Sequence, residues 1–190
     1  MQLGTLRPRF RVMDGLPARG DLAISFPPAW GLTGQEGLVV EFRVGDARWV
    51  ANFRLGFSGA TCVVRHPNPD WVLAVSSGSG WVVDPRTKTA EELPQQVDAL
   101  WQLDDSDDLI LSCSGLHFVR LGQNGVLWHT RRLSWDGFVE VRLTRESIEG
   151  MACYPQREEP KAFRVDLQTG RSSGGSYSEE DSEGWERLRE

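Results

Sequence analysis

Lysine, tyrosine and cysteine are scarce in this sequence of 190 residues. Lys88 and Lys161 are the only lysines among 21 basic residues, so arginine supplies nearly all of the positive charge. Positive charge is not in excess either, because the formal net charge is −6. A chain without a basic surplus lacks the electrostatic footprint that draws proteins to phosphate backbones or anionic lipid. We therefore expect neither nucleic acid nor a membrane as its partner.

The three cysteines, Cys62, Cys113 and Cys153, form no CxxC pair. This spacing argues against a zinc ribbon or a redox motif, and we expect buried, reduced thiols. The segment from Met1 to Phe26 contains no apolar run long enough for a signal-peptide core or a membrane span. These absences together predict a cytoplasmic protein.

Signatures of catalysis and cofactor binding are also missing. No GxSxG motif lies between a strand and a helix, where the nucleophile elbow of a hydrolase would be. The run from Ser76 to Gly80 lacks the Lys-Ser/Thr pair and the following helix of a phosphate loop, so we interpret it as a hairpin turn. Asp104, Asp105, Asp107 and Asp108 cluster without the glycine and distal glutamate of an EF-hand loop. We expect a solvated turn there, with a weak cation site as the alternative, and no cofactor.

What the chain does contain is a series of short apolar runs separated by Gly, Asp, Asn and Pro, a pattern typical of strands joined by tight turns. The turns near Lys88, Gly125 and Gly170 are 37 and 45 residues apart, close to the length of one propeller blade. The sequence therefore predicts an all-β fold of repeated antiparallel meanders of about 40 residues, propeller-like or in stacked sheets. The predicted strands cover 38–44, 48–55, 71–75, 81–84, 99–103, 109–113, 116–121, 126–130, 138–143, 147–153 and 162–166, with a short strand reaching 174–177.

The domain organisation expected from this pattern is one all-β domain over residues 1–177. Residues 1–35 show no strand pattern, so we expect an irregular amino-terminal segment within that domain. Residues 178–190 are polar and acidic, and we expect them to form a mobile tail, with a short terminal helix that docks Trp185 as the alternative.

The three histidines do not predict a metal site. His117 and His129 lie on the two arms of one hairpin, and pairing of residue 121 with 126 places them on opposite faces of the sheet. A bulge of one residue would bring them together. His66 precedes a proline-broken turn and is expected to be an exposed loop residue.

Eight tryptophans stand against two tyrosines. Most should fill the core, but two or three that lined a groove would bind a sugar or a peptide. The candidate binding residues are Trp135 with Asp136, Trp81, and the acidic pair Asp104 and Asp105. For Asp136 the alternative is a structural turn in which its carboxylate accepts hydrogen bonds from backbone amides.

Three motifs stand out in the last third of the chain: Leu133-Ser134-Trp135-Asp136-Gly137, the run from Val165 to Gly170, and Gly174-Gly175-Ser176-Tyr177. Together they resemble a β-rich bacterial family of uncharacterised proteins with propeller-like repeats, over the carboxy-terminal two thirds of the chain. The resemblance implies a fold, and it brings no activity, cofactor or catalytic residue to this sequence.

The leading functional hypothesis is a non-enzymatic protein-interaction module whose partner is unknown. One version is an immunity or inhibitor-type protein that neutralises a basic toxin by charge complementarity. The alternative is a carbohydrate-binding or small-molecule-binding protein, or a hydrolase, that uses tryptophan and carboxylate side chains. A homodimer that hides open sheet edges is a third hypothesis.

Overall fold

The structure is a computed structural model, and it describes residues 7–19, 22–57, 59–155 and 159–178. The predicted tail lies outside these residues, except for Ser178. Sixteen strands in the described part of the chain form four sheets of four strands, and each sheet is built from one continuous stretch of sequence. The all-β prediction is therefore confirmed.

We name the sheets A to D in chain order. Sheet A contains β1 (Arg9–Val12), β2 (Ile24–Phe26), β3 (Leu38–Val44) and β4 (Ala47–Phe53), in the order β1-β3-β4-β2, with the 3₁₀ helix η1 (Pro28–Thr33) after β2. Sheet B contains β5 (Cys62–Arg65), β6 (Val72–Ser76), β7 (Ser79–Asp84) and β8 (Thr89–Glu92). Sheet C contains β9 (Val97–Gln102), β10 (Leu109–Cys113), β11 (His117–Gly122) and β12 (Gly125–His129). Sheet D contains β13 (Phe138–Leu143), β14 (Ser147–Ala152), β15 (Lys161–Asp166) and β16 (Ser172–Gly174).

Sheets B, C and D are simple antiparallel meanders, in which each strand pairs with the next. Sheet A differs, because β2 pairs with β4 in parallel. Short turns set the register of the hairpins. Ser77 and Gly78, both with positive φ, connect β6 to β7 as a two-residue turn, so Ser76 and Ser79 already pair. The turn is thus shorter than the Ser76–Gly80 turn that the sequence predicts, since positive φ at both central residues produces the tight hairpin connection.

Three apolar layers join the four sheets. Phe42, Phe53 and Trp81 lie in the layer between sheets A and B. Leu73, Leu109 and Leu111 lie between sheets B and C, and Phe118 and Phe163 lie between C and D. Sheets B and C therefore bury both faces, which explains why Val72–Val75 and Leu109–Leu111 are uninterrupted apolar runs.

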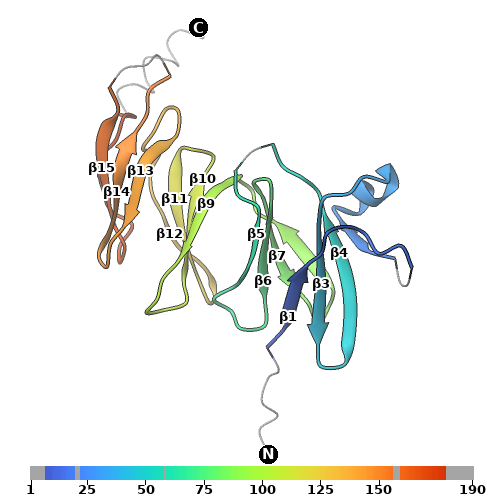
Figure 1. Cartoon of the computed structure of the whole chain (residues 1–190). Coiled ribbons are helices and arrows are strands. Elements are labelled where there is room, and N and C mark those ends of the chain that lie inside the picture. Colours follow the sequence, from blue (N-terminus) through green and yellow to red (C-terminus); the bar gives the residue numbers. More distant parts are fainter. Residues whose placement is uncertain (1–6, 20–21, 58, 156–158, 179–190) are drawn as a thin grey trace, which may run out of the picture.

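The sheets form an open row rather than a ring. Figure 1 shows sheet D at one end of the row and sheet A at the other, and in the described part of the chain no apolar layer contains residues from both. The outer face of sheet D is polar, with an ion pair between Arg164 and Glu149. The outer face of sheet A carries Arg11, Arg43 and the buried Glu41. Of the two predicted arrangements, the structure shows stacked sheets.

The amino-terminal segment is less irregular than its sequence predicts. Within its described part, β1 and β2 complete the two edges of sheet A, and η1 lies beside β2. The pattern of these strands is obscured because edge strands are short and half exposed. The edge strands β5 and β8 escaped prediction for the same reason.

Candidate binding cavity between sheets C and D

The loop from Leu133 to Gly137 connects sheet C to sheet D and is held by two buried serines. The Ser134 hydroxyl donates to the carbonyl oxygen of Gly137 and accepts from the backbone N–H of Asp136 at 3.2 Å. The Ser176 hydroxyl donates to the carbonyl of Cys153 at 2.8 Å and accepts from the Trp135 N–H at 3.2 Å. The two serine hydroxyls thus hold the backbone of the loop. The predicted alternative, in which the Asp136 carboxylate caps these backbone amides, is not needed.

Trp135 is held in place by a cationic and an aromatic neighbour. Its ring meets the ring of Tyr177 edge to face at 4.9 Å between centroids. The Arg132 guanidinium lies 4.7 Å from the Trp135 ring and 4.5 Å from the Tyr177 ring, and it donates to the Ser134 carbonyl at 2.9 Å. Contacts of this type stabilise an aromatic side chain in one orientation. Trp135 is therefore a preorganised wall of the site rather than a mobile side chain.

Trp135 and Asp136 line a cavity of about 630 Å³. β9 forms one side of it and the start of β13 forms the other, and both are edge strands of their sheets. Trp101 and Phe138 provide further aromatic surface. The cavity thus lies where the edge strands of sheets C and D approach each other.

Three carboxylates line this cavity: Asp98, Asp136 and Glu140. Asp98 accepts a hydrogen bond from the Gly115 N–H, which holds it against the β10–β11 turn. Asp136 is exposed, and its carboxylate has no ion pair or hydrogen bond with any residue that the structure describes. Among the residues that the structure describes, no arginine or lysine lines the cavity. It therefore combines negative charge with two indole rings.

Glu140 reaches the cavity through a β-bulge. β13 pairs Val139 with Met151 and Arg142 with Glu149, so Glu140 and Val141 together oppose one residue of β14. Glu140 has φ +54°, a left-handed conformation that is unfavourable for a residue with a side chain. Bulges and strained residues cluster near functional sites, because they redirect side chains. Sequence reasoning missed Glu140, and no turn residue in β13 signals the bulge.

The other candidate residues do not join this cavity. Trp81 is 3% exposed and packs against Phe26 and Phe53 between sheets A and B, so it belongs to the core. Asp104 and Asp105 line a different cavity, of about 1090 Å³, near the opposite end of β9. Of the five predicted residues, Trp135 and Asp136 line this cavity, and Asp104 and Asp105 line the other.

The histidines depart from their predicted positions. A bulge in the β11–β12 pair places His129 opposite Val119, so His117 and His129 share one face of sheet C and line an apolar cavity of about 230 Å³. The prediction of opposite faces was wrong, because it assumed a regular register. Burial and the neighbouring His129 lower the pKa of His117, whose Nε2 lies 2.7 Å from Gln95 Oε1. Among the described residues, no three His, Cys, Asp or Glu side chains come together as metal ligands.

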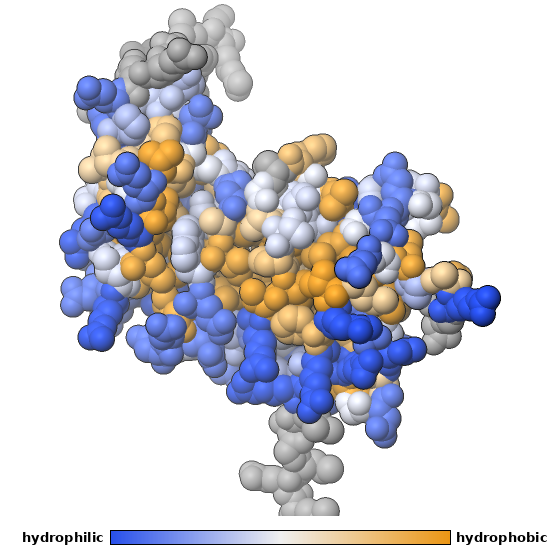
Figure 2. Space-filling view, in the orientation of Figure 1, coloured by the Kyte–Doolittle hydropathy of each residue, from blue (hydrophilic) through white to orange (hydrophobic). Residues whose placement is uncertain are grey.

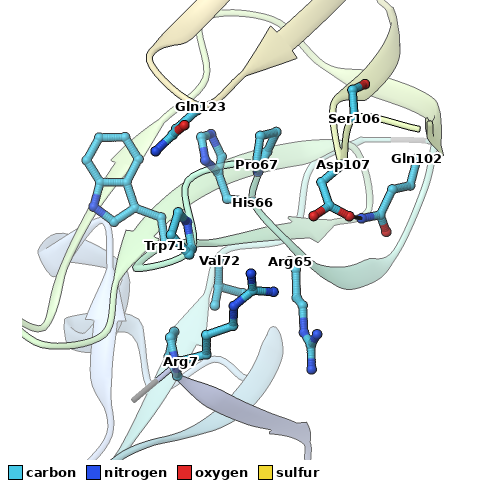
Figure 3. A pocket seen from close by; sticks show the side chains of 12 residues that line it. Arg7, Arg65, His66, Pro67, Trp71, Val72, Gln102, Ser106, Asp107 and Gln123 are labelled. Carbon is cyan, nitrogen blue, oxygen red and sulfur yellow. Dashed lines mark hydrogen bonds between the residues drawn. The ribbon is translucent and has the colours of Figure 1, made fainter. Parts of the chain in front are cut away.

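His66 is buried rather than exposed, because the loop folds back over it. Its Nδ1 accepts a hydrogen bond from the Asn68 N–H at 3.0 Å, and its ring packs against Trp71. Burial lowers the pKa of His66 to about 4. Figure 3 shows His66 in the wall of a cavity of about 580 Å³ that also includes Arg7 and Arg65.

The cysteines are free thiols, as predicted, although only one of them is buried. Cys113 lies in the layer between sheets B and C, and burial together with the nearby Asp98 raises its pKa to about 12. Cys62 and Cys153 are half-buried.

No protein-family model matches the chain, and no curated protein is significantly similar to it. The resemblance to a β-rich bacterial family therefore stays a prediction. In the part of the chain that the structure describes, no helix combines the length and the apolar character needed to cross a bilayer.

Proposed function

We propose that the protein is a non-enzymatic interaction module that binds a positively charged segment of a protein partner in the cavity between sheets C and D. The observation that carries this proposal is the arrangement of Asp98, Asp136 and Glu140 around Trp101 and Trp135. An arginine or lysine side chain fits such a site, because its cation is attracted both by carboxylates and by indole faces.

The strand edges beside the cavity support binding of an extended chain. β9 and β13 are edge strands, and an edge strand has backbone N–H and C=O groups that a partner strand can pair with. Backbone pairing supplies affinity in this mode of recognition, while pockets beside the edge select side chains. The partner that suits both features is an extended segment with a basic side chain at the position of the cavity.

An immunity or inhibitor-type role is the specific version of this proposal. The net charge of −6 favours association with a basic partner, since complementary charge steers encounter and disfavours wrong partners. The function needs no cofactor. We propose a cytoplasmic setting on the sequence pattern alone.

Carbohydrate binding is the second candidate function. Trp101 and Trp135 line one cavity together with carboxylates, and indole faces stack on sugar rings while carboxylates accept hydrogen bonds from hydroxyl groups. The volume of about 630 Å³ is within the range of small-molecule sites. The affinity for a sugar ligand would depend little on salt, whereas the affinity for a basic peptide would fall as the salt concentration rises.

The first experiment is affinity purification of the tagged full-length chain, with mass spectrometry of the bound proteins and light scattering of the complex. A stoichiometric partner with a basic surface segment is the expected result. A chain that elutes alone and binds glycans in an array, with affinity unchanged by salt, would replace the interaction proposal with the carbohydrate one.

Two pairs of substitutions test the cavity itself. The double variant Asp136→Asn/Glu140→Gln should weaken partner binding by about two- to thirtyfold, because each exposed charge pair contributes about 0.2–1 kcal/mol. Asp104→Asn/Asp105→Asn is the matched control, since it removes the same charge from another cavity. Isothermal titration calorimetry with the purified partner measures both. Equal effects of the two variants would show that net charge, and not this cavity, governs binding.

A further inference from the structure

A second charged surface lies at the other end of the molecule, on the outer face of sheet A. Arg9, Arg11, Arg43 and Arg48 alternate with Phe10, Phe42 and Trp49 along β1, β3 and β4, and those three aromatic side chains face sheet B. The four arginines therefore point away from the row of sheets. We call this surface the arginine face.

The arginines are packed closely by the strand register. Arg9 pairs with Arg43, and Arg43 pairs with Arg48, so three arginines form one row across three strands. Arg11 pairs with Glu41 in the next row. Like charges directly opposite each other on a sheet are destabilising. This row therefore needs negative charge near it.

Glu41 supplies part of that charge. It is 4% exposed because the arginine side chains cover it, with N···O distances of 2.8 Å to Arg43, 3.5 Å to Arg48 and 3.6 Å to Arg11. Burial by itself would raise the pKa of Glu41, but the hydrogen bond from Arg43 and the three positive charges lower it overall. Glu41 is thus a carboxylate that remains ionised.

One carboxylate does not neutralise four guanidinium groups. The strands of the arginine face carry four arginines and one glutamate, a charge of 4 − 1 = +3, while the whole chain carries −6. The arginines that contact Glu41 are still exposed: the exposed fraction of the side chain is 66% for Arg11, 54% for Arg43 and 65% for Arg48. Their guanidinium groups are accessible to a further anion.

The chain itself contains a strongly acidic segment. Residues 179–190 include six carboxylates and two arginines, at Glu179, Glu180, Asp181, Glu183, Glu186, Glu190, Arg187 and Arg189. This segment follows Tyr177, whose carbonyl oxygen accepts a hydrogen bond from Arg131 at 3.0 Å beside sheets C and D. The acidic segment therefore starts at the far end of the row from the arginine face (Figure 1).

Distance rules against contact within one molecule. Three sheet spacings of about 10 Å separate sheet D from sheet A, or about 30 Å, and the arginine face points outward from there. Twelve residues span about 40 Å when fully extended. A segment of this length would extend fully just to reach sheet A. Its acidic residues could not also lie across the outer face of that sheet.

We propose that the arginine face binds residues 179–190 of a second copy of this chain. The contact is head to tail, because the surface on one copy differs from the segment on the other, so it either closes by reciprocal exchange of the segment or continues from copy to copy. Exposed charge pairs are weak and screened by salt, so the dissociation constant is on the order of 100 μM at low ionic strength.

Sedimentation velocity of the full-length protein tests this proposal. At about 20 mM salt the mean sedimentation coefficient should rise with protein concentration up to about 200 μM, and at about 500 mM salt it should not. Arg9→Gln/Arg48→Gln should abolish the rise. Arg142→Gln/Arg145→Gln, which removes the same charge from sheet D, should leave it intact. A rise that survives the first double variant would overturn the proposal, as would no rise at all.

A variant substituted only in the acidic segment gives a second test. Glu179→Gln/Glu180→Gln/Asp181→Asn/Glu183→Gln in the full-length chain should abolish association as well. A fluorescent peptide of residues 178–190 should bind this variant, with affinity lower by about two- to thirtyfold after Arg9→Gln/Arg48→Gln is added. If a DNA oligonucleotide binds the arginine face and the peptide does not, another polyanion is the occupant and the proposal is wrong.

Discussion

Buried polar side chains determine the conformation of two loops, one between sheets C and D and one within sheet B. Ser134 and Ser176 each bond to backbone groups beneath the Trp135 loop, and His66 does the same within the β5–β6 turn. A buried polar group contributes to stability when it is hydrogen-bonded, and its loss leaves backbone groups unpaired. These residues act on the shape of the loops rather than on a ligand.

The buried His66 makes stability depend on pH. Its pKa is about 4 in the folded protein and near 6.5 in the unfolded chain, so between these values the unfolded chain binds more protons. Above pH 6.5, His66 is neutral in both states and does not lower the free energy of unfolding. As the pH drops to 4, protonation of His66 in the unfolded chain should lower this free energy by about 3 kcal/mol. Urea unfolding across this range measures it.

The variant His66→Gln serves as the control, because the titration of all carboxylates is common to both proteins. We expect its free energy of unfolding to be lower than that of the wild type at pH 7 and to change less between pH 6.5 and 4. Parallel curves for the two proteins would contradict the assignment of this pH dependence to His66.

The strained Glu140 implies a conflict between stability and binding. Replacing it by glycine removes the cost of a positive φ for a residue with a side chain, so Glu140→Gly should stabilise the fold by about 0.5–1 kcal/mol. The same change removes a carboxylate from the cavity. Thermal unfolding and partner binding should therefore move in opposite directions, and Glu140→Gln, which keeps the strain, should reduce binding without raising stability.

The strands themselves were largely predictable, and their irregularities were not. All predicted strands between Leu38 and Asp166 lie within two residues of those in the structure, because period-two alternation and tight turns are local signals. β1, β2, β5 and β8 were missed, since edge strands such as Thr89–Glu92 are formed through pairing with a neighbour. The bulges that place His129 and Glu140 depend on packing between sheets, which no local pattern encodes.

Close approach between elements makes one glycine sensitive to substitution. A Cβ at Gly56 would lie 2.3 Å from the carbonyl oxygen of Ser77 and 2.7 Å from the Ser79 nitrogen, both in the β6–β7 hairpin. Gly56→Ala should cost more than about 2 kcal/mol, because backbone atoms must move. Gly45→Ala is the comparison, with φ +58° but open space, and should cost about 1 kcal/mol. Equal losses in denaturant unfolding would contradict this reasoning.

Each sheet of the molecule is stabilised only by its neighbours in the row. Sheet A packs on B, B on C, and C on D, through three separate apolar layers. Figure 2 shows an apolar band across the middle of the visible surface, with hydrophilic side chains below it and towards both ends. The polar outer faces of sheets A and D limit further stacking, as do the capping units of repeat proteins. Repeat length predicted the four units, but only the structure distinguished an open row from a ring.

Phe118 is the side chain that couples sheet D to the rest of the molecule. It is fully buried, with its ring 4.7 Å from that of Phe138 and 5.5 Å from that of Phe163. Phe118→Ala should lower the free energy of unfolding by about 3–5 kcal/mol. Hydrogen exchange should show the largest loss of protection in sheets C and D, with sheets A and B affected least. A uniform loss over all four sheets would show that the protein unfolds as one unit.

The open row also has a mechanical consequence. When sheets A and D are pulled apart, each of the three apolar layers carries the full force, because the layers are arranged in series. In a closed ring, the force would be divided between the two routes around the ring. The weakest layer then sets the force at which the molecule first yields, and the other two keep their structure until the load rises again. Extension in an optical trap should accordingly proceed in separate steps, each releasing the length of one or more whole sheets.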